Sequence, residues 1–479
     1  MSKFSEQQKK ITPSLPSGTR DFSPEVVRKR QYIFKTVRDV FELYGFQPIE
    51  TPAMENLVTL TGKYGEEGDQ LIFKVLNNGL NRKSEEDKKK LNAEWDKVLS
   101  ESYSSSIVTE RALRYDLTIP FARYVVMHQN ELAFPFRRYQ IQPVWRGDKP
   151  QKGRYREFWQ CDADVIGSTS LINEAELLCI YSSAFEKLGL STVIKFNSRK
   201  ILAGLAEVCG EPDRLTDITI ALDKLDKVHW PGVVDELASR GLSENAIRKI
   251  RELIDSIPTG SHNDFSELKR KMQSSETGMQ GIIELEKILE YYRQLKGVIH
   301  ENTPNSKSEI SFSITLARGL SYYTGFIVEV IAKGVEMGSI GGGGRYDDLT
   351  GLFGLKEMSG VGISFGIDRT YDVMEKLGKF PKQLNASTKV LIMNLGSIKD
   401  NESLLILQKL RAKKINAEIY PDAVKEDKQY KYAMKREIPF ILFTEGYTDK
   451  FILKNIITKK VFELPMNECI EKIKKYKLS

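Results

Sequence analysis

Apolar and polar positions follow two periods along the first half of the chain, one helical and one strand-like. Residues 24–43 place apolar side chains three or four positions apart, which predicts a helix, and a glycine follows them. Residues 46–52 (FQPIETP) predict a strand or an extended segment. Alternation with period two predicts strands at 136–146 and 154–166, and residues 173–188 predict an amphipathic helix.

The second half of the chain changes its pattern twice. Residues 213–300 are charged and mostly helical in period, which predicts an inserted helical subdomain. Strand-like runs at 310–316 and 326–332 then predict a return to a sheet. Residues 376–388 are typical of a linker. In residues 389–479 strands alternate with helices, which predicts a small α/β domain with a mainly parallel sheet.

The length of 479 residues also favours two or three domains, because a single hydrophobic core rarely grows to this size. Residues 1–14 are predicted to be a polar tail and residues 15–375 the main domain. Within that domain, residues 79–106 are charged and rich in serine, which predicts a surface insertion.

The composition excludes several classes of protein. With 41% hydrophobic and 29% charged residues, the chain is globular rather than disordered or fibrous. No uninterrupted apolar run approaches the roughly 18 residues that span a bilayer. The first ten residues lack the apolar core of a secretory signal and the arginines of a transit peptide. We therefore expect a cytoplasmic protein with no membrane segment.

Positive charge is concentrated at the C-terminal end. Residues 386–479 contain 19 lysines and arginines and 12 aspartates and glutamates, so their net charge is +7. The whole chain also has a net charge of +7, so the other 385 residues are neutral overall. The excess indicates either a solvated lysine-rich surface or a module for a polyanion, most plausibly nucleic acid.

Several kinds of catalytic site lack a sequence signal. The four cysteines have no C-x-x-C spacing, and the four histidines form no H-E-x-x-H motif, so neither a zinc site nor a redox pair is expected. There is no GxxxxGK[ST] and no G-x-G-x-x-G. If the protein binds a nucleotide, other residues must hold the phosphates.

The predicted hairpin at 139–166 carries the most informative residues. Period two places one set of side chains on the same face of its second strand, namely Arg154, Arg156, Phe158, Gln160, Asp162 and Asp164. Arg146 ends the first strand on the facing side. This face suits an elongated ligand with an anion, a ring and a cation, because a guanidinium offers paired donors to phosphate oxygens. The alternative is an exposed hairpin held by salt bridges.

Two further segments favour close contact with a ligand. Residues 114–123 (RYDLTIPFAR) place Asp116 and Thr118 just before a predicted helix, where the carboxylate either grips an ammonium or caps the helix. Residues 338–349 (GSIGGGGRYDDL) contain four consecutive glycines, which allow the backbone to approach a ligand or to form a flexible turn.

Arginines recur in the last two informative segments. Residues 316–330 (LARGLSYYTGFIVEV) combine Arg318 with Tyr322 and Tyr323, which suit either a ligand pocket or the core. Residues 360–369 (GVGISFGIDR) predict a strand that enters a helix near Arg369. Arginines without a catalytic His, Cys or Ser favour displacement at phosphorus, where positioning and charge stabilisation suffice.

These motifs resemble the class II aminoacyl-tRNA synthetases, and among them the histidyl-tRNA synthetases. Residues 44–52 (YGFQPIETP) resemble the family's first motif, a helix and strand of the dimer interface. The hairpin at 139–166 resembles its second motif and residues 360–369 its third. RYDLT at 114–118 and LARGLSYYTG at 316–325 resemble the histidine-specific segments.

The resemblance runs from about Pro16 to the C-terminus and is weakest over residues 79–106. It implies an α+β catalytic domain with an antiparallel sheet, a helical insertion at about 213–300 and a C-terminal α/β anticodon-binding domain. One departure concerns Asp164, which stands where bacterial relatives often have glutamate.

The resemblance also implies residue roles. Arg146 and Arg318 would be catalytic, with Arg318 stabilising charge at the reacting phosphorus. The ATP-binding residues would be Arg146, Arg154, Phe158 and Arg369, with Phe158 stacked on adenine. The histidine-binding residues would be Asp116, Leu117, Thr118, Arg146, Gln160, Asp164, Arg318, Tyr322 and Tyr323. Mg²⁺ would bridge the ATP phosphates, and no protein ligand is assigned to it.

The implied activity is that of a histidine–tRNA ligase. It would form histidyl-adenylate and pyrophosphate from L-histidine and ATP, and then transfer histidine to the terminal ribose of tRNA(His). The implied assembly is a homodimer. The alternative function is a catalytically silent, synthetase-like regulatory or RNA-sensing module.

Overall fold

The protein comprises two compact units, which the computed structural model describes over most of the chain. The described residues are 12–61, 65–100, 105–151, 153–257, 264–300, 307–317, 322–381, 384, 388–396, 400–444 and 449–476. The first unit consists of residues 1–21 and 32–379, and the second of residues 22–31 and 380–479. Within the described part of the chain, no helix has the length and apolar composition needed to cross a membrane.

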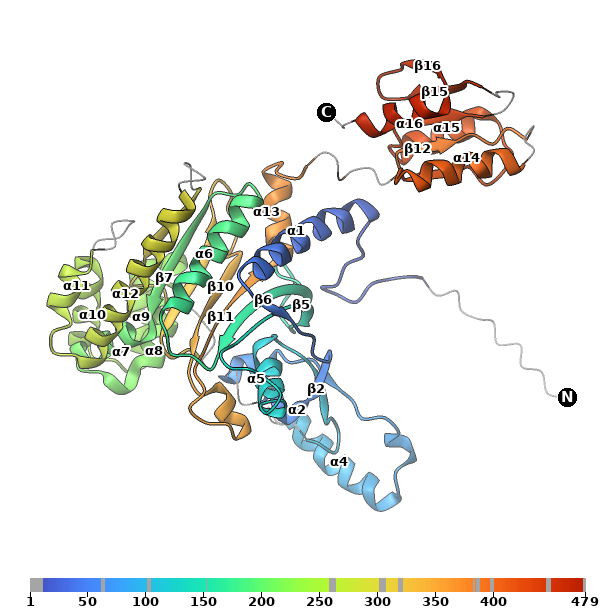
Figure 1. The fold of residues 1–479 in the computed structure, drawn as a ribbon. Helices are drawn as coiled ribbons and strands as arrows, with labels where there is room; N and C mark the ends of the chain where they lie inside the picture. Colours follow the sequence, from blue (N-terminus) through green and yellow to red (C-terminus); the bar gives the residue numbers. More distant parts are fainter. Residues whose placement is uncertain are drawn as a thin grey trace. The chain divides into compact units, whose positions relative to one another are not determined.

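An eight-stranded sheet forms the centre of the first unit (Figure 1). Its strand order is β1-β5-β6-β11-β10-β9-β7-β8, and only the β1–β5 and β7–β8 pairs are parallel. The predicted antiparallel sheet is therefore confirmed. Its strands are β1 (Gln47–Pro48), β5 (Phe136–Trp145), β6 (Glu157–Ile166), β7 (Thr192–Ser198), β8 (Ser308–Phe312), β9 (Phe326–Ala332), β10 (Gly341–Tyr346) and β11 (Gly360–Gly366).

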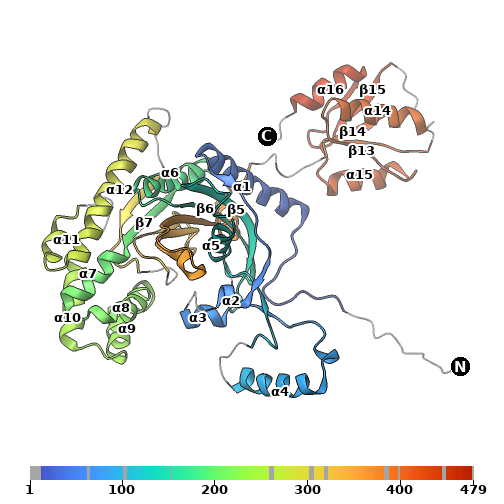
Figure 2. The same ribbon diagram turned by 60° about the horizontal axis from the view of Figure 1, so that its bottom comes forward.

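Helix α6 (Ile172–Lys187) covers one face of this sheet, and α1 (Pro24–Leu43) reaches the same face with its second half (Figure 2). The contacts are aromatic, because Phe365 of β11 lies 5.7 Å from the ring of Phe41 and 4.8 Å from that of Tyr181. These rings are fully buried or nearly so. Over the described residues this apolar face is thus covered by helices, which leaves the other face for a ligand.

The other face of the sheet meets α5 (Thr118–Met127) and a small antiparallel sheet. Arg138 of β5 places its guanidinium 4.3 Å from the ring of Phe121 on α5. The small sheet has the order β2-β4-β3, with β2 (Met54–Asn56), β3 (Lys74–Val75) and β4 (Arg111–Leu113). The remaining α-helices of this unit outside the α7–α12 segment are α2 (Leu57–Leu60), α3 (Gly65–Gln70), α4 (Glu85–Ser100) and α13 (Ile367–Lys376).

Two insertions extend from the sheet (Figure 2). The segment predicted as a surface insertion contains α4. The segment predicted as a helical insertion is helical, and the helix before it, α7, packs on α12 where Gly204 meets Gly278: an added Cβ on Gly204 would lie 2.5 Å from the Gly278 Cα. The helices from here on are α7 (Arg199–Cys209), α8 (Leu215–Leu222), α9 (Leu225–Ser239), α10 (Glu244–Ser256), α11 (Ser266–Lys271) and α12 (Glu276–His300).

The second unit contains a five-stranded sheet in the order β13-β12-β14-β15-β16. The prediction of a mainly parallel sheet is wrong: β12 pairs parallel with β13 and β14, but β14–β15 and β15–β16 are antiparallel. The sheet is mixed because the last connections are too short for a parallel crossover. The elements are β12 (Val390–Ile392), α14 (Asp400–Ala412), β13 (Ala417–Ile419), α15 (Glu426–Lys435), β14 (Phe440–Phe443), β15 (Phe451–Asn455), β16 (Val461–Leu464) and α16 (Met466–Lys475).

Candidate active site

Polar side chains gather on the face of the sheet that α6 does not cover. The strand period places Gln160, Asp162 and Asp164 of β6 together, while Cys161 and Ala163 enter the buried aromatic side. The antiparallel register sets three polar residues of β5 opposite this row, and the pairs are Arg138 with Asp164, Gln140 with Asp162, and Gln142 with Gln160. The hairpin therefore presents two facing polar rows.

Glycines on the neighbouring strands leave room for these side chains. A Cβ on Gly362 of β11 would lie 1.9 Å from Asp164 Oδ1, and a Cβ on Gly344 of β10 would lie 2.9 Å from the Tyr323 ring. The consecutive glycines therefore belong to a strand rather than to a flexible turn. They allow side chains of the protein to approach closely, and close approach to a ligand stays a prediction.

A cavity of about 530 Å³ lies over this face. Six of the predicted site residues line it, namely Arg146, Arg154, Phe158, Gln160, Tyr323 and Arg369. The backbone of Gly341, Gly342 and Gly343 forms part of the wall. The cavity thus contains an arginine-rich part and reaches Gln160, one end of the polar row on β6.

Arg146 is held at the start of the hairpin loop. Its Nε donates to the Tyr115 carbonyl at 3.1 Å, and its guanidinium lies 4.3 Å from the Tyr115 ring and 5.1 Å from the Phe158 ring. Among the described residues, no carboxylate lies within ion-pair distance of Arg146. A guanidinium fixed by rings and a carbonyl keeps its positive charge available for an anion.

Arg369 and Arg154 occupy the outer part of the cavity. Arg369 on α13 donates to the carbonyls of Gly153 and Ser339 at 2.8 and 2.9 Å, which fixes its direction. Arg154 is more exposed, and its Nη1 lies 3.6 Å from Asp148 Oδ1. The two arginines therefore differ in rigidity, and Arg369 is the better ordered anion partner.

Three buried carboxylates lie deeper, around one buried arginine. Asp116, Asp162 and Asp164 are each at most 3% exposed, and Arg138 is fully buried. Arg138 Nη2 lies 2.7 Å from Asp164 Oδ2, so this ion pair balances one of the three possible negative charges. Burial raises the pKa of Asp162 to about 7 and also raises the pKa of Asp164, with Arg138 opposing both shifts.

Tyrosine hydroxyls complete this cluster. Tyr346 of β10 donates to Asp164 Oδ1 at 2.6 Å, and Tyr322 donates to Asp116 Oδ2 at 3.2 Å. The Tyr322 and Tyr323 rings meet edge to face with centroids 5.0 Å apart. Burial and the neighbouring carboxylates raise the pKa of Tyr323, so its hydroxyl stays protonated as a donor. The cluster combines carboxylates and hydroxyls that suit a small polar ring.

The segment before α5 is fixed by Arg114. Its guanidinium is buried and donates to the carbonyls of Thr51 and Pro143 at 2.7 and 2.8 Å, and burial lowers its pKa to about 10. Asp116 Oδ1 accepts from the Ile119 amide at 3.2 Å, as expected for the capping alternative, while its other oxygen meets Tyr322. Asp116 therefore caps the start of α5 with one oxygen and joins the cluster with the other.

The remaining predicted residues differ in how the structure places them. Leu117 is fully buried, and its carbonyl accepts from Arg138 Nη2 at 3.3 Å. Thr118 opens α5. Arg318 lies outside the described residues. The sequence analysis did not single out Arg138 or Tyr346, although the period-two alternation of Arg138 with Gln140 was a usable signal.

No group of three or more His, Cys, Asp or Glu side chains in the described part of the chain is placed to hold a metal ion.

Comparison with known proteins identifies the family. The family model for histidyl-tRNA synthetase matches residues 108–370, which include the hairpin, the tyrosine pair and Arg369. The chain belongs to the histidyl-tRNA synthetase family. The chain is similar to the histidine–tRNA ligase of Christiangramia forsetii, with 51% identity over 95% of this chain and 98% of the relative. The histidine–tRNA ligase of Bacteroides fragilis is also 51% identical, over 93% of this chain and 95% of the relative.

A solved structure supports the same assignment. The histidyl-tRNA synthetase of Nostoc superposes with a TM-score of 0.78 and 30% identity, and the match covers 97% of this chain and 100% of that one. The resemblance drawn from the motifs is thus confirmed at the level of family and fold.

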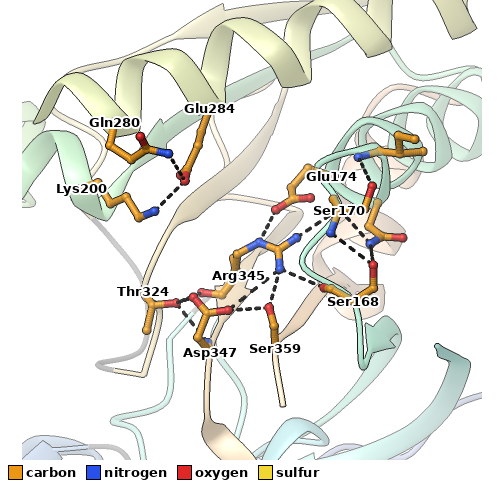
Figure 3. A network of polar contacts seen from close by, with 12 residues as sticks. Ser168, Ser170, Glu174, Lys200, Gln280, Glu284, Thr324, Arg345, Asp347 and Ser359 are labelled. Atoms are coloured by element: carbon orange, nitrogen blue, oxygen red, sulfur yellow. Dashed lines mark hydrogen bonds and ion pairs between the residues drawn. The ribbon is translucent and has the colours of Figure 1, made fainter. Parts of the chain in front are cut away.

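In this synthetase fold, Arg345 connects the site to the helix-covered side of the sheet (Figure 3). Its guanidinium pairs with the fully buried Glu174 at the start of α6 and donates to Ser359 Oγ at 2.6 Å. Its carbonyl accepts from the Thr324 amide at 2.8 Å, directly after Tyr323. The network therefore fixes the chain that carries the tyrosine pair.

We expect Glu174→Gln to lower the free energy of unfolding by about 2 kcal/mol, because it leaves the Arg345 charge buried without a counter-ion. Urea denaturation would measure the change. Glu284→Gln is the matched control. Glu284 pairs with Lys200 at 2.6 Å, and this pair is more exposed to solvent than the pair of Glu174 with Arg345 (Figure 3). Its loss should stay within roughly 1 kcal/mol. Equal losses in the two variants would contradict the role assigned to Arg345.

A second cavity, of about 500 Å³, lies within the second unit. Three lysines line it, Lys460, Lys472 and Lys475, together with Phe462 and Tyr476. Lys472 Nζ lies 4.0 Å from the Phe462 ring. Lysines interleaved with aromatic rings are typical of a surface that binds single-stranded nucleic acid.

Proposed function

We propose that this protein activates L-histidine with ATP and then transfers histidine to the terminal ribose of tRNA(His). The observation that carries the proposal is the cavity itself, which is lined by three arginines and by Gln160 and Tyr323, next to a buried cluster of carboxylates and tyrosines. The first part suits the phosphates of a nucleotide and the second suits an amino acid with a polar ring. The histidine–tRNA ligases to which the chain is similar support the same activity.

The first step is displacement at phosphorus. A carboxylate oxygen of histidine attacks the α-phosphorus of ATP, the bond to the bridging oxygen breaks, and pyrophosphate leaves. Arg146 holds the α-phosphate, and Arg318 stabilises the charge that develops at the reacting phosphorus. Arg369 and Arg154 bind the outer phosphates. Catalysis then depends on alignment and charge stabilisation, without a protein nucleophile.

Adenine and the amino acid occupy different parts of the cavity. Phe158 stacks on adenine. Asp116 binds the histidine ammonium beside Leu117 and Thr118, and Gln160 contacts the same end of the amino acid. Asp164, Tyr322 and Tyr323 line the ring pocket. A pocket that hydrogen-bonds ring nitrogens rejects isosteres that lack them, because its buried polar groups would then lose their partners.

Magnesium fits the outer part of the cavity. Glu329 and Asp368 line it beside Arg369, and carboxylate oxygens together with phosphate oxygens are the ligands that Mg²⁺ prefers. When bound, the ion neutralises charge on the outer phosphates. Of the two, Glu329 is the residue that would hold the ion, because Asp368 uses one oxygen to accept from the Trp159 amide at 3.0 Å and the other to pair with Arg20.

In the second step the terminal ribose hydroxyl attacks the carbonyl carbon of the adenylate, and AMP leaves. The second unit, with its basic excess and lysine-lined cavity, binds the anticodon part of the tRNA. Residues 44–52 belong to the interface of a homodimer, and the enzyme works in the cytoplasm.

Amino-acid-dependent exchange of pyrophosphate into ATP tests the proposal. We expect exchange with L-histidine only, when each standard amino acid is tried in turn with the full-length protein and Mg²⁺. Exchange with another amino acid would contradict the assigned substrate. Absence of exchange with all of them would instead favour the catalytically silent module, provided that the protein is folded.

A further inference from the structure

A tight turn lies in the chain before α1, at residues 16–19. The Thr19 amide donates to the Pro16 carbonyl at 3.1 Å, and the Thr19 hydroxyl donates to the same carbonyl at 2.8 Å. Gly18 adopts a left-handed backbone conformation with φ of 85°, which glycine accepts without strain. The turn therefore has a defined shape, and Arg20 follows it directly.

This turn is hydrogen-bonded to the base of the loop between β5 and β6. The Gly18 carbonyl accepts from the Arg156 amide at 2.9 Å, and the Arg156 carbonyl accepts from the Arg146 amide at 2.9 Å. An added Cβ on Gly18 would lie 2.8 Å from Arg156 Cγ, so glycine allows the two chain segments to approach closely. The N-terminal turn thus contacts the loop that carries Arg146 and Arg154.

Arg20 lies between this loop and the start of α13. Its guanidinium carbon lies 3.3 Å from the centroid of the Tyr155 ring, and its Nη2 forms an ion pair with Asp368 Oδ1 in the first turn of α13. Asp368 is only 4% exposed, and its other oxygen accepts from the Trp159 amide at 3.0 Å. Arg20 therefore connects the hairpin loop to a carboxylate that is itself fixed.

Arg20 contacts the chain neighbour of each arginine in the outer part of the cavity. Tyr155 follows Arg154, and Asp368 precedes Arg369. Tyr155 and Asp368 line the cavity, whereas Arg20 is not among the described residues that line it. Any effect of Arg20 on a ligand must therefore pass through these two neighbours.

Two further hydrogen bonds join the loop to α13. The Tyr155 hydroxyl donates to Asp372 Oδ2 at 3.2 Å, and Arg369 Nε donates to the Gly153 carbonyl at 2.8 Å. The loop contains Gly147, Pro150 and Gly153, so little in its own sequence would hold it in one conformation. Contacts from outside the loop therefore decide where Arg154 lies.

We infer that Arg20 is a positioning residue of the nucleotide site. It fixes the hairpin loop against α13, so that Arg154 and Arg369 already face the outer phosphates when ATP arrives. A site that is ordered in advance binds more tightly, because less conformational freedom is lost on binding. The inference rests on the proposed function and adds a residue to which the family resemblance assigned no role.

The first test is pyrophosphate exchange by full-length Arg20→Ala. We expect the Michaelis constant for ATP to rise about tenfold, because both arginine-bearing segments lose an anchor. The Michaelis constant for histidine should stay within twofold of the wild type. Each constant is measured at a saturating concentration of the other substrate. A variant that is damaged throughout its fold would lose both substrates alike, so the split reports positioning.

Two milder variants test the same contact where Arg20→Ala folds poorly. Arg20→Lys keeps the charge beside Asp368 but cannot lie flat on the Tyr155 ring, so the rise for ATP should be smaller, about threefold. Gly18→Ala leaves Arg20 intact but strains the turn and crowds Arg156, so it should also raise the constant for ATP by about threefold.

A double-mutant cycle tests whether Arg20 acts through Tyr155. Tyr155→Leu removes the ring on which the guanidinium lies. If the two residues act as one unit, adding Arg20→Ala to Tyr155→Leu should raise the constant for ATP less than about threefold further. Additive effects would mean that Arg20 acts by another route, and they would overturn the inference.

Arg240→Ala is the matched control. The Arg240 side chain is 30% exposed, against 26% for Arg20, and it pairs with Asp217 and Glu236 in the helical insertion. It lines neither described cavity. Its loss should leave both Michaelis constants within twofold of the wild type, because it removes a comparable ion pair far from the hairpin loop in sequence.

The inference is overturned if Arg20→Ala keeps its Michaelis constant for ATP within twofold of the wild type. It is also overturned if the constant for histidine rises equally, since Arg20 would then support the fold in general. Wild-type protein without histidine-dependent exchange would overturn the proposed function instead. Calorimetric titration of ATP with Mg²⁺ into the wild type and Arg20→Ala, without histidine, would still test the inference, with about tenfold weaker binding expected in the variant.

Discussion

Replacement of Arg146 by alanine is expected to lower the rate of histidine-dependent pyrophosphate exchange by roughly 10³-fold, as for other arginines that stabilise phosphoryl transfer. The guanidinium is held between the rings of Tyr115 and Phe158 and by the Tyr115 carbonyl, so it needs no reorganisation to meet the α-phosphate. Alanine removes the charge and the paired donors together.

Arg146→Lys tests the geometry rather than the charge. Lysine keeps a positive charge but cannot give two parallel hydrogen bonds or stack between two rings, so we expect a loss of roughly 10²-fold. The matched control is Arg154→Ala. Arg154 lines the same cavity but is more exposed and lies 3.6 Å from Asp148, so the expected loss is about tenfold or less.

Single-turnover measurements would separate chemistry from binding. In both Arg146 variants histidine affinity should fall far less than the exchange rate, because Arg146 is only one of the predicted histidine contacts and its main partner is the α-phosphate. Arg146→Ala with exchange within tenfold of the wild type would contradict its assigned role. A loss of histidine binding equal to the loss of exchange would place Arg146 on the amino acid instead.

The sequence predicted the hairpin well because a period of two decides which side chains share a face. Once Gln160 is known to face the ligand, Asp162 and Asp164 must follow, and the register adds Arg138 and Gln140 from β5. The sequence could not reveal the hydrogen bond from Tyr346 to Asp164, because the two residues lie 182 positions apart and meet only through the pairing of β10, β11 and β6.

The error in the second unit has a physical cause that the sequence shows in part. The mainly parallel sheet of the second unit was inferred from alternating strands and helices, but Phe443 and Phe451 lie too close in sequence for a crossover helix. The close contact of α7 with α12 depends on Gly204 and Gly278, which lie far apart in the sequence. Such packing leaves no local pattern.

Three lysines of the second unit line one cavity and are expected to bind phosphates of the tRNA. Substitution of Lys460, Lys472 and Lys475 by glutamine should raise the Michaelis constant for tRNA by roughly 100-fold, about fivefold for each lysine that pairs with a phosphate. These lysines line one cavity with Phe462 and Tyr476, so phosphates and stacked bases can be held together. Histidine-dependent pyrophosphate exchange should remain within twofold of the wild type, because it does not involve tRNA.

Salt dependence decides whether these lysines meet phosphates. If all three do, the slope of log affinity against log salt should be smaller by about two in the triple glutamine variant, because roughly 0.7 counterions are released per phosphate of a single strand.

The matched control is a triple variant of Lys409, Lys413 and Lys414, which are equally basic but line neither described cavity. It should change the slope less. Equal effects of the two triple variants would mean that the domain attracts tRNA by its net charge alone. Unchanged slopes in both would mean that tRNA does not touch these lysines, and the C-terminal excess of charge would then be a solvated surface.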